Sequence, residues 1–195
     1  GRGLGGGSSN AAATLLALDG LWGLGLEKED LAPLARRLGA DVPFFLQGGL
    51  CLGEGIGDRL TALPDLPPLA CLLVFPPFPI ATASVYAGLG PVLTSPAKVS
   101  KIERFLESRD FGLLENDLER VIFRAHPELE RWKSFFQGEG ALVAQVSGSG
   151  SAVYGLFPDP ARAEAARRRL PGTTDARLVA TLPRAGYWAQ LGAGA

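Results

Sequence analysis

The sequence predicts an α+β protein with two domains. Its 195 residues are enough for one large domain or two small ones. The proline-rich stretch PDLPPL (64–69) interrupts the apolar patterns and marks a candidate boundary. Beyond it, the predicted order strand, helix, helix, strand, helix, strand is typical of helices packed on one face of an antiparallel sheet. We therefore expect one domain at residues 1–64, a second at 65–183, and a tail at 184–195.

The first predicted element is a helix over residues 8–22. Ser8, Ser9 and Asn10 are residue types that favour the N-cap position. The following AAATLLAL contains strong helix formers and no charged side chain before Asp19. Because a helix that is apolar nearly all round is normally buried, we expect this one to be buried.

Three further elements complete the first domain. Leucine and alanine at helical spacing predict a helix over residues 27–38, which Gly39 would end. ADVPFFL (40–46) predicts a short helix with Asp41 at its start. The glycine-interrupted stretch 48–60 predicts a hairpin or two short strands.

The second domain is predicted to centre on two apolar strands within residues 141–157, which flank a tight Gly/Ser turn. The other predicted elements are strands at 70–75 and 176–182 and helices at 82–88, 98–107, 115–125, 127–136 and 159–170. The tail from Pro183 shows no periodic pattern, and we expect it to fray.

Composition excludes several classes of partner. A formal net charge of −1 argues against a basic face for nucleic acid or an anionic membrane. The longest apolar run, LACLLVF (69–75), is far shorter than the roughly 18 residues of a membrane span. We expect no secretory signal. Cys51 and Cys71 lie in apolar runs and are expected as buried thiols. We expect a cytoplasmic protein with a small-molecule partner.

The opening GRGLGGGSSNAAATLLALDG (1–20) has the pattern of an anion site. Glycines allow backbone N–H groups to surround phosphate oxygens, and the start of a helix adds positive potential. Ser8 and Ser9 add hydroxyl groups that could also ligate Mg²⁺. The alternative is a flexible linker, which the helix predicted directly after the serines disfavours.

Two known phosphate motifs are compared with this loop. GxxxxGK[ST] fails because no lysine precedes the serines. GxGxxG matches at Gly1, Gly3 and Gly6, but Asp19 falls inside the predicted helix, so the ribose-binding acid is missing. An NAD-dependent oxidoreductase therefore remains an alternative hypothesis.

Several stretches resemble the GHMP small-molecule kinases. GRGLGGGSSNAAA (1–13), LGADVPFFL (38–46) and VSGSGSAVYGLF (146–157) resemble three motifs of that family in the correct order. NDLE (116–119) and PFPIATASVY (77–86) fit in order and spacing. The resemblance implies the two-domain GHMP-kinase fold. The GLGGGSSNAA form is similar to the branch that uses ATP to phosphorylate the 2-hydroxyl of 4-(cytidine 5'-diphospho)-2-C-methyl-D-erythritol in non-mevalonate isoprenoid synthesis.

The resemblance also implies roles for individual residues. The ATP phosphates would be held by Gly1, Gly3, Leu4, Gly5, Gly6, Gly7, Ser8 and Ser9. Mg²⁺ is an implied cofactor, assisted by Ser8 or Ser9, although no metal ligand set is predicted. Asp41 would accept or orient the proton of the substrate hydroxyl. Helix capping is the alternative interpretation of Asp41, and the two roles can coexist.

The second glycine turn and its surroundings are further candidates. The resemblance places Gly148, Ser149 and Thr82 near nucleotide and substrate, while a plain hairpin is an equal alternative for the turn. Asn116 and Asp117 could touch substrate, but a helix cap is the preferred interpretation. His126 is predicted to be a surface residue.

The family's catalytic lysine precedes the glycine loop. The lysines of this sequence, which match no such motif, are Lys28, Lys98, Lys101 and Lys133. The sequence also contains no Met and begins on a loop that normally follows a strand. We therefore expect a piece of a longer kinase, with an incomplete N-terminal domain and no activity by itself. A catalytically dead remnant is a third hypothesis, and the expected assembly is a monomer or homodimer.

Overall fold

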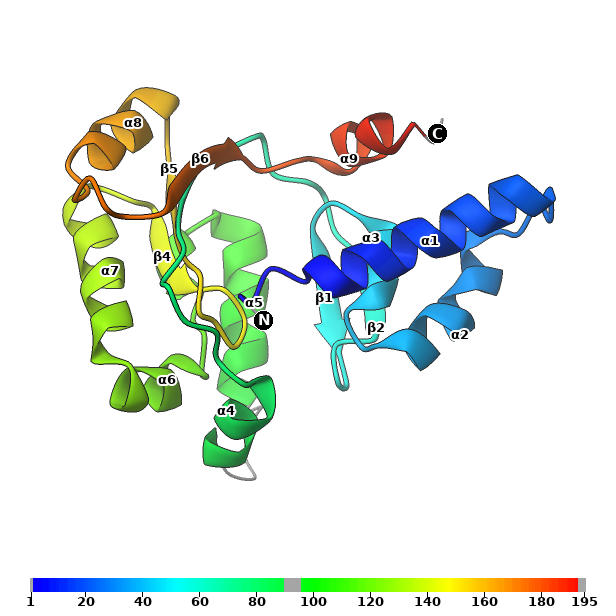
Figure 1. Ribbon diagram of the computed structural model, residues 1–195, viewed down its shortest axis with the longest axis horizontal. Coiled ribbons are helices and arrows are strands. Elements are labelled where there is room, and N and C mark those ends of the chain that lie inside the picture. The colour runs from blue at the N-terminus through cyan, green and yellow to red at the C-terminus, as the bar shows by residue number, and fades with distance from the viewer. Residues whose placement is uncertain (1, 90–95, 193–195) are drawn as a thin grey trace. The chain divides into compact units, whose positions relative to one another are not determined.

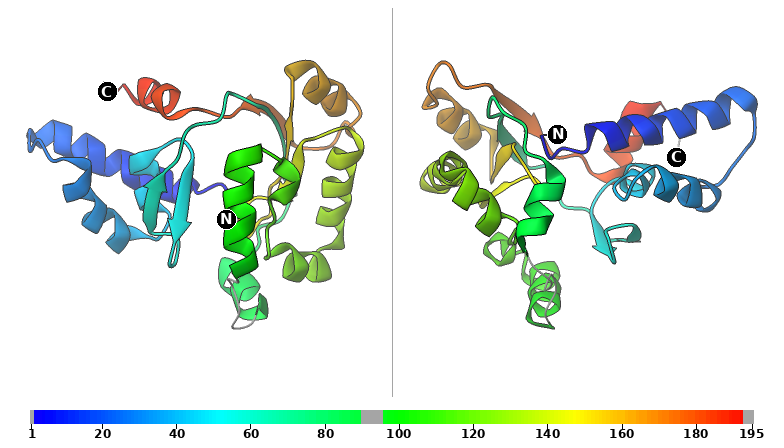
Figure 2. Two further views of the ribbon diagram at one scale, coloured as in Figure 1. Left: turned by 180° about the vertical axis from the view of Figure 1, so that it is seen from behind. Right: turned by 60° about the horizontal axis from the view of Figure 1, so that its bottom comes forward.

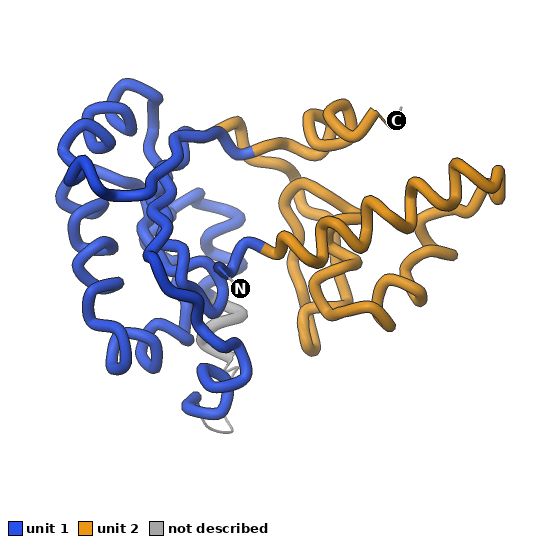
Figure 3. The backbone as a smooth tube through the Cα atoms, viewed as in Figure 1, with its two compact units in different colours: residues 1–4, 69–181 blue, residues 5–68, 182–195 orange. Residues whose placement is uncertain are grey.

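The computed structural model describes residues 2–89 and 96–192 (Figure 1). The chain forms two compact units, which are coloured separately in Figure 3. Unit 1 contains residues 1–4 and 69–181, and unit 2 contains residues 5–68 and 182–195. One boundary between the units falls at the end of the proline-rich stretch, and another falls inside the glycine loop. The domain limits at residues 64 and 183 stay a prediction.

Unit 1 contains a four-stranded antiparallel sheet. Its strand order is β4 (Val143–Val146), β5 (Val153–Phe157), β3 (Ala70–Val74) and β6 (Ala176–Ala180). The central strand β3 is buried along most of its length, and Leu72 lies opposite Gly155 on one neighbour and Leu178 on the other. The alternating apolar side chains of the sheet thus face one core.

Helices cover the apolar face of this sheet. The helices of unit 1 are α4 (Thr82–Leu89), α5 (Pro96–Ser108), the 3₁₀ turn η1 (Phe111–Leu113), α6 (Glu119–Ala125), α7 (Pro127–Gly138) and α8 (Pro160–Arg168). Leu72, Phe136 and Phe157 belong to the core that α7 and α8 share with the strands. Figure 2 shows the ribbons of these helices and strands from two further directions. Gly155 lets α7 approach, because a Cβ there would lie 3.0 Å from the Phe136 ring. The predicted α+β class, with helices on an antiparallel sheet, is confirmed.

Unit 2 combines helices with a hairpin. Its elements are α1 (Gly6–Trp22), α2 (Lys28–Leu38), α3 (Val42–Gln47), β1 (Cys51–Glu54), β2 (Arg59–Ala62) and α9 (Arg184–Leu191). Helix α1 packs on α2 and α3 around a small core made of Ala12, Leu31, Ala35, Val42 and Leu46. Strands β1 and β2 pair antiparallel, which confirms the predicted hairpin.

The expectation of a buried first helix is wrong. In α1, all of which the structure describes, Ala12 is the one buried residue. Leu21 and Trp22 are 76% and 63% exposed. The helix is apolar all round, but only one of its sides packs on α2 and α3.

The expectation of a frayed tail is wrong for residues 184–191. These residues form α9, and the side chain of Trp188 is only 8% exposed. The apolar residues of α9 are too few to show a periodic pattern, yet they find partners within unit 2.

Both cysteines are free thiols, and the prediction of burial is confirmed for Cys71 but not for half-buried Cys51. Burial raises the pKa of the Cys71 thiol to about 12. Within residues 2–89 and 96–192, no helix combines the length and apolar character needed to cross a bilayer.

Candidate functional site

The first glycine loop leads into α1 with its helix start uncapped. Gly5 is the N-cap residue, in the left-handed conformation at φ 65° and ψ 21°, and no side chain caps the helix. The first helical hydrogen bond runs from Ser9 N to Gly5 O at 2.8 Å. The N–H groups of Gly6, Gly7 and Ser8 therefore have no hydrogen-bond acceptor among the described residues.

Space and backbone geometry also suit an anion at this point. A Cβ built on Gly6 or Gly7 would meet no atom of the described chain within 4 Å. On Gly5, by contrast, a Cβ would lie 2.8 Å from the Phe45 ring. Unpaired donors at the start of a 17-residue helix, with no atom near the Cβ positions of Gly6 and Gly7, form the kind of site that binds phosphate.

The predicted cap residues of this helix are wrong. The helix was expected to begin at residue 8, with Ser8, Ser9 and Asn10 as candidate N-cap residues, but it begins two residues earlier, at Gly6, and its N-cap residue is Gly5. The left-handed backbone of Gly5 starts the helix without a side-chain cap. The two serines consequently lie in the first turn, next to the unpaired N–H groups. Gly1 lies outside the described residues, and Leu4 is an exposed residue of unit 1.

Asp41 stands at the N-terminus of α3, which packs against α1. Val42 and Leu46 of α3 share a core with Ala12 of α1, so the helix that begins beside Asp41 lies against the helix that follows the glycine loop. The Asp41 side chain is exposed, and it makes no cap hydrogen bond. No ion pair or hydrogen bond engages its carboxylate in the described part of the chain. Capping by the side chain therefore does not explain this aspartate.

The C-terminal helix α9 holds the other end of α3. Tyr187 donates its hydroxyl to Phe45 O at 2.7 Å, and the Trp188 indole N–H lies 3.4 Å from Gln47 O. Gly48 is needed beneath the Tyr187 ring, because a Cβ at this glycine would lie 2.6 Å from the ring. The sequence showed no sign of this contact, since its partners are more than 140 residues apart.

A carboxylate fastens the start of α9 to the hairpin. Asp65 accepts hydrogen bonds from Leu50 N at 2.8 Å and from Arg184 N at 2.7 Å. Arg184 in turn donates to Leu50 O at 3.0 Å. These backbone N–H groups, foremost that of Leu50, hold the pKa of Asp65 below its ordinary value. Asp65 was read only as part of a proline-rich joint, and no local pattern marks its role.

In unit 1, the start of the glycine loop lies directly on the second glycine turn. Ser147 donates its hydroxyl to Gly3 O at 2.8 Å, and Ala152 N donates to Arg2 O at 3.0 Å. Gly3 has φ 79°, and a Cβ at this position would lie 1.9 Å from Ser147 O. Only glycine fits here, so the two motifs that the sequence singled out meet at Gly3.

The second glycine turn brings together the remaining predicted residues. Gly148 and Gly150 both have positive φ, at 54° and 84°. The hydroxyl oxygens of Thr82 and Ser149 are 2.8 Å apart, which joins the start of α4 to the turn. Ser151 is fully buried and donates to Phe78 O at 2.6 Å. Thr82, Gly148 and Ser149 are thus neighbours in unit 1.

The lysines with described side chains have structural partners. Lys28 lies 4.3 Å from the centre of the Trp188 ring, Lys101 pairs with Glu115, and Lys133 pairs with Glu119. The side chain of Lys98 lies outside the described part. The predicted surface residue His126 is partly exposed, and its ring stacks on Phe78 at 4.9 Å.

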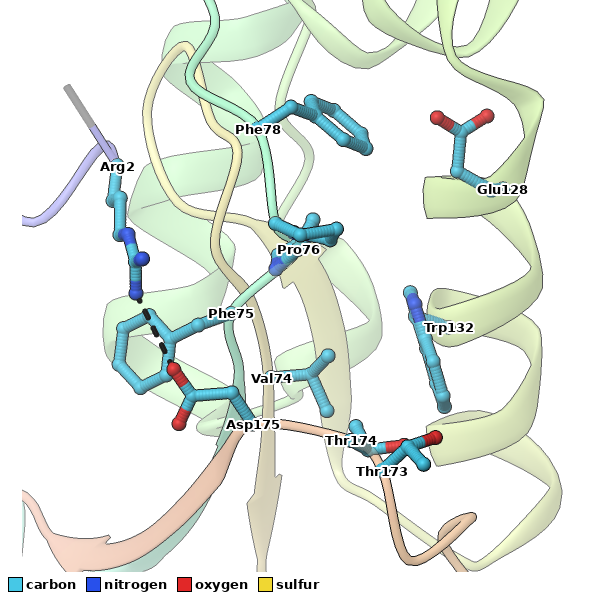
Figure 4. A pocket seen from close by; sticks show the side chains of 11 residues that line it. Arg2, Val74, Phe75, Pro76, Phe78, Glu128, Trp132, Thr173, Thr174 and Asp175 are labelled. Carbon is cyan, nitrogen blue, oxygen red and sulfur yellow. Dashed lines mark hydrogen bonds and ion pairs between the residues drawn. The ribbon is translucent and has the colours of Figure 1, made fainter.

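A pocket of about 540 Å³ lies elsewhere in unit 1 (Figure 4). Its walls include Phe78 and Trp132, and at one side the Arg2 guanidinium lies over the Phe75 ring and 3.5 Å from Asp175. None of the predicted site residues lines it. In the part of the chain that the structure describes, no three His, Cys, Asp or Glu residues are grouped to hold a metal ion.

Comparison with known proteins decides the family. The model of the GHMP kinases N-terminal domain matches residues 1–49, and that of the GHMP kinases C-terminal region matches residues 99–174. The chain belongs to the GHMP kinase family. The matched ranges contain the first glycine loop, Asp41 and the second glycine turn.

Individual relatives of this GHMP kinase chain agree with the family match. It is 44% identical over 170 residues to the 4-diphosphocytidyl-2-C-methyl-D-erythritol kinase of Pelobacter propionicus, covering 86% of this chain and 60% of the relative. The enzyme of the same name from Syntrophus aciditrophicus is 44% identical over 174 residues, covering 88% and 62%. The chain thus spans about three fifths of these curated relatives.

Solved structures show the same fold. A crystal structure of 4-(cytidine 5'-diphospho)-2C-methyl-D-erythritol kinase has 38% identity and a TM-score of 0.76, covering 92% of this chain and 66% of that chain. Homoserine kinase from Cytophaga hutchinsonii, at 20% identity and a TM-score of 0.72, shares the fold over 94% of this chain and 66% of its own.

The dinucleotide hypothesis finds no support. The family match is to kinases, and α1 leads into helices α2 and α3, where a dinucleotide-binding unit would continue into a parallel strand. The glycine loop of this GHMP kinase chain therefore matches the dinucleotide pattern GxGxxG, at Gly1, Gly3 and Gly6, only by coincidence.

Proposed function

We propose that this chain is part of an ATP-dependent kinase that phosphorylates the 2-hydroxyl of 4-(cytidine 5'-diphospho)-2-C-methyl-D-erythritol. The names of the relatives at 44% identity support this substrate. The observation that carries the proposal is the unpaired, exposed carboxylate of Asp41, on a helix packed against the one that presents unpaired N–H groups at Gly6, Gly7 and Ser8.

The glycine loop is suited to bind the β- and γ-phosphates of ATP. Gly6, Gly7 and Ser8 would donate backbone N–H groups, and the positive end of the α1 dipole adds to the attraction. Gly3 and Leu4 continue the loop toward the second glycine turn, where Ser149 could add a further donor. Mg²⁺, when bound, neutralises charge on the phosphates. The hydroxyls of Ser8 and Ser9 fit such an ion as assisting groups, because both lie in the first turn of α1.

Asp41 would act on the acceptor. Its carboxylate accepts the proton of the substrate 2-hydroxyl while that oxygen forms a bond to the γ-phosphorus. The bond from the γ-phosphorus to the β,γ-bridging oxygen breaks, and ADP leaves. For Thr82 and Ser149 of unit 1, contact with the substrate stays a prediction.

Asp41→Asn, prepared in the whole protein, tests this assignment. We expect turnover to fall by about 100-fold or more, while the Kd for ATP stays within a few-fold. Stability should not change, because the Asp41 carboxylate has no partner to lose. Glu54→Gln, which alters an exposed acid on the hairpin of the same unit, is the matched control.

The measurements are ADP release with the cytidine diphosphate substrate, ATP binding by calorimetry, and ³¹P NMR of the product. Near-normal turnover in Asp41→Asn would refute the catalytic role of this residue. A wild-type protein that binds ATP but leaves this substrate unphosphorylated would refute the substrate, and one that transfers to no acceptor would favour the catalytically dead remnant.

A further inference from the structure

The NDLE motif at residues 116–119 contacts the second glycine turn through side chains. The Asn116 side-chain amide donates to Val146 O at 2.9 Å and to Gly148 O at 2.8 Å. Its side-chain oxygen accepts from Leu118 N at 3.0 Å. Two acceptors on one side and a donor on the other allow a single orientation of the amide. Helix α6 begins at Glu119 with Leu118 as its N-cap residue and no side-chain cap, so the predicted capping role of Asn116 is wrong, and its side-chain oxygen instead forms a local turn before the helix.

Glu119 holds the strand that leads into the same turn. Its side chain is buried, and Oε1 accepts from Val146 N at 2.8 Å. Oε2 is paired with Lys133 of α7. Val146 is thus held through its N–H by Glu119 and through its C=O by Asn116.

These contacts set the direction of peptide planes in the turn. In a trans peptide, the carbonyl of one residue and the N–H of the next point in opposite directions. Holding Gly148 O against Asn116 therefore points the Ser149 N–H away from Asn116. Among the described residues, this N–H has no hydrogen-bond acceptor. The Ser147 N–H, opposite Val146 O, instead donates to Ala152 O at 2.8 Å and closes the turn.

We infer that Asn116 and Glu119 form a clamp that orients the second glycine turn and thereby sets the affinity of the site for ATP. The inference rests on the proposed function, in which this turn contributes to the nucleotide site. Asn116 is a positioning residue, because it acts through Gly148 and Ser149. The clamp contacts the second glycine turn through Val146 and Gly148, and Gly3 contacts the same turn through Ser147.

The variant Asn116→Asp separates the clamp from the hydrogen bond that Asn116 accepts from Leu118 N. Aspartate keeps the oxygen that accepts from Leu118 N, and its side chain forms this kind of local turn as readily as that of asparagine. It replaces the NH₂ donor with a second carboxylate oxygen, which repels Val146 O and Gly148 O. We expect the Kd and KM for ATP to rise about tenfold, with kcat within a few-fold of wild type. Asn116→Ala, which removes both roles, should weaken ATP binding to a similar extent.

Hydrogen exchange tests the clamp without any ligand. In both Asn116 variants, the amides of Ser147 and Gly150 should exchange about tenfold faster, because the turn that protects them is loosened. Asp110→Ala is the matched control. Asp110 caps η1 of the same unit by accepting from Gly112 N at 2.9 Å and has no contact with the turn. This control should leave both exchange and ATP affinity unchanged.

Each outcome decides the inference. Wild-type behaviour of Asn116→Asp, with damage only in Asn116→Ala, would show that Asn116 acts only through its bond to Leu118 N and would overturn the clamp. Faster exchange with unchanged ATP affinity would overturn its link to the nucleotide. Failure of both variants to fold would also overturn it, because the residue would then be structural. A wild-type protein that does not bind ATP would refute the proposed function, while the exchange comparison would still decide whether the clamp exists.

Discussion

The two glycine-rich segments of this chain differ in how many of their polar groups are already bonded. At the start of α1, three consecutive N–H groups have no acceptor among the described residues, and a Cβ on Gly6 or Gly7 would meet no described atom within 4 Å. In the second turn, Ser147, Ser149 and Ser151 all have side-chain partners. The first segment therefore offers N–H donors to a ligand. In the second segment most of these polar groups are already bonded, although the Ser149 N–H has no acceptor among the described residues.

This difference shows that glycine serves two purposes in one protein. In the second turn and at Gly3, glycine permits positive φ and close backbone packing, and the cost of its flexibility is offset by many hydrogen bonds. At Gly6 and Gly7, glycine leaves the Cβ positions of the first helical turn empty. The comparison predicts opposite effects when side chains are added to the two segments.

Gly3→Ala should have the largest effect. The new methyl group would collide with Ser147 O, and alanine disfavours a φ of 79°. We expect a loss of about 3 kcal/mol in the free energy of unfolding of unit 1. Urea denaturation measures it, with Gly172→Ala as control, since a Cβ at Gly172 meets no described atom within 4 Å. Equal stability of the two variants would contradict the close contact at Gly3.

The variants Ser151→Ala and Ser9→Ala should change the free energy of unfolding in opposite directions. Ser151 is fully buried, and its loss leaves Phe78 O without its donor, at a cost of about 1–2 kcal/mol. Ser9 has no side-chain hydrogen bond in the described structure, and alanine favours helix, so its replacement should stabilise by a few tenths of a kcal/mol, roughly. Urea denaturation compares the two. A destabilising Ser9→Ala would mean that the first segment is not open.

Asp65→Asn tests whether unit 2, which carries the open loop, also has a rigid frame. The folded-state pKa of Asp65 is lowered, so its stabilisation is present above its unfolded pKa of about 4 and is lost as pH falls through the lower folded pKa. The free energy of unfolding of the wild type should exceed that of the variant by about 1 kcal/mol near pH 7. This difference in stability should become smaller below about pH 4. Melting temperatures across this range measure it, and a gap independent of pH would contradict the role of the charge.

Gly7→Ala should have the smallest effect on stability and a clear effect on binding. Alanine favours helix and meets open space, so we expect a gain of about 0.5 kcal/mol. Its methyl group would intrude on the proposed phosphate position and weaken ATP binding. Denaturation and calorimetry on the same variant show whether stability and affinity change in opposite directions. Unchanged ATP affinity would argue against this part of the loop as the phosphate site.

Local patterns predicted most elements, but several details required the third dimension. The hairpin, the strands of unit 1 and the end of α2 at Gly39 follow from periodicity and turn residues within short windows. The cap of α1 was misjudged, because a glycine in the left-handed conformation replaced the serines. The tail was misjudged because α9 is stabilised by Phe45 O and Gln47 O, far away in the sequence.

The sequence by itself determined most helices and strands, the α+β class and the two glycine motifs, because these depend mainly on patterns within single helices and hairpins, but it did not determine α9 or the start of α1. Tertiary structure alone decided which polar groups are satisfied and which remain for a ligand. Asn116 reaches Gly148 across 32 residues, and Asp65 reaches Arg184 across 119. Hydrogen bonds at such separations depend on how the packed elements place donors and acceptors, and no local pattern encodes that placement.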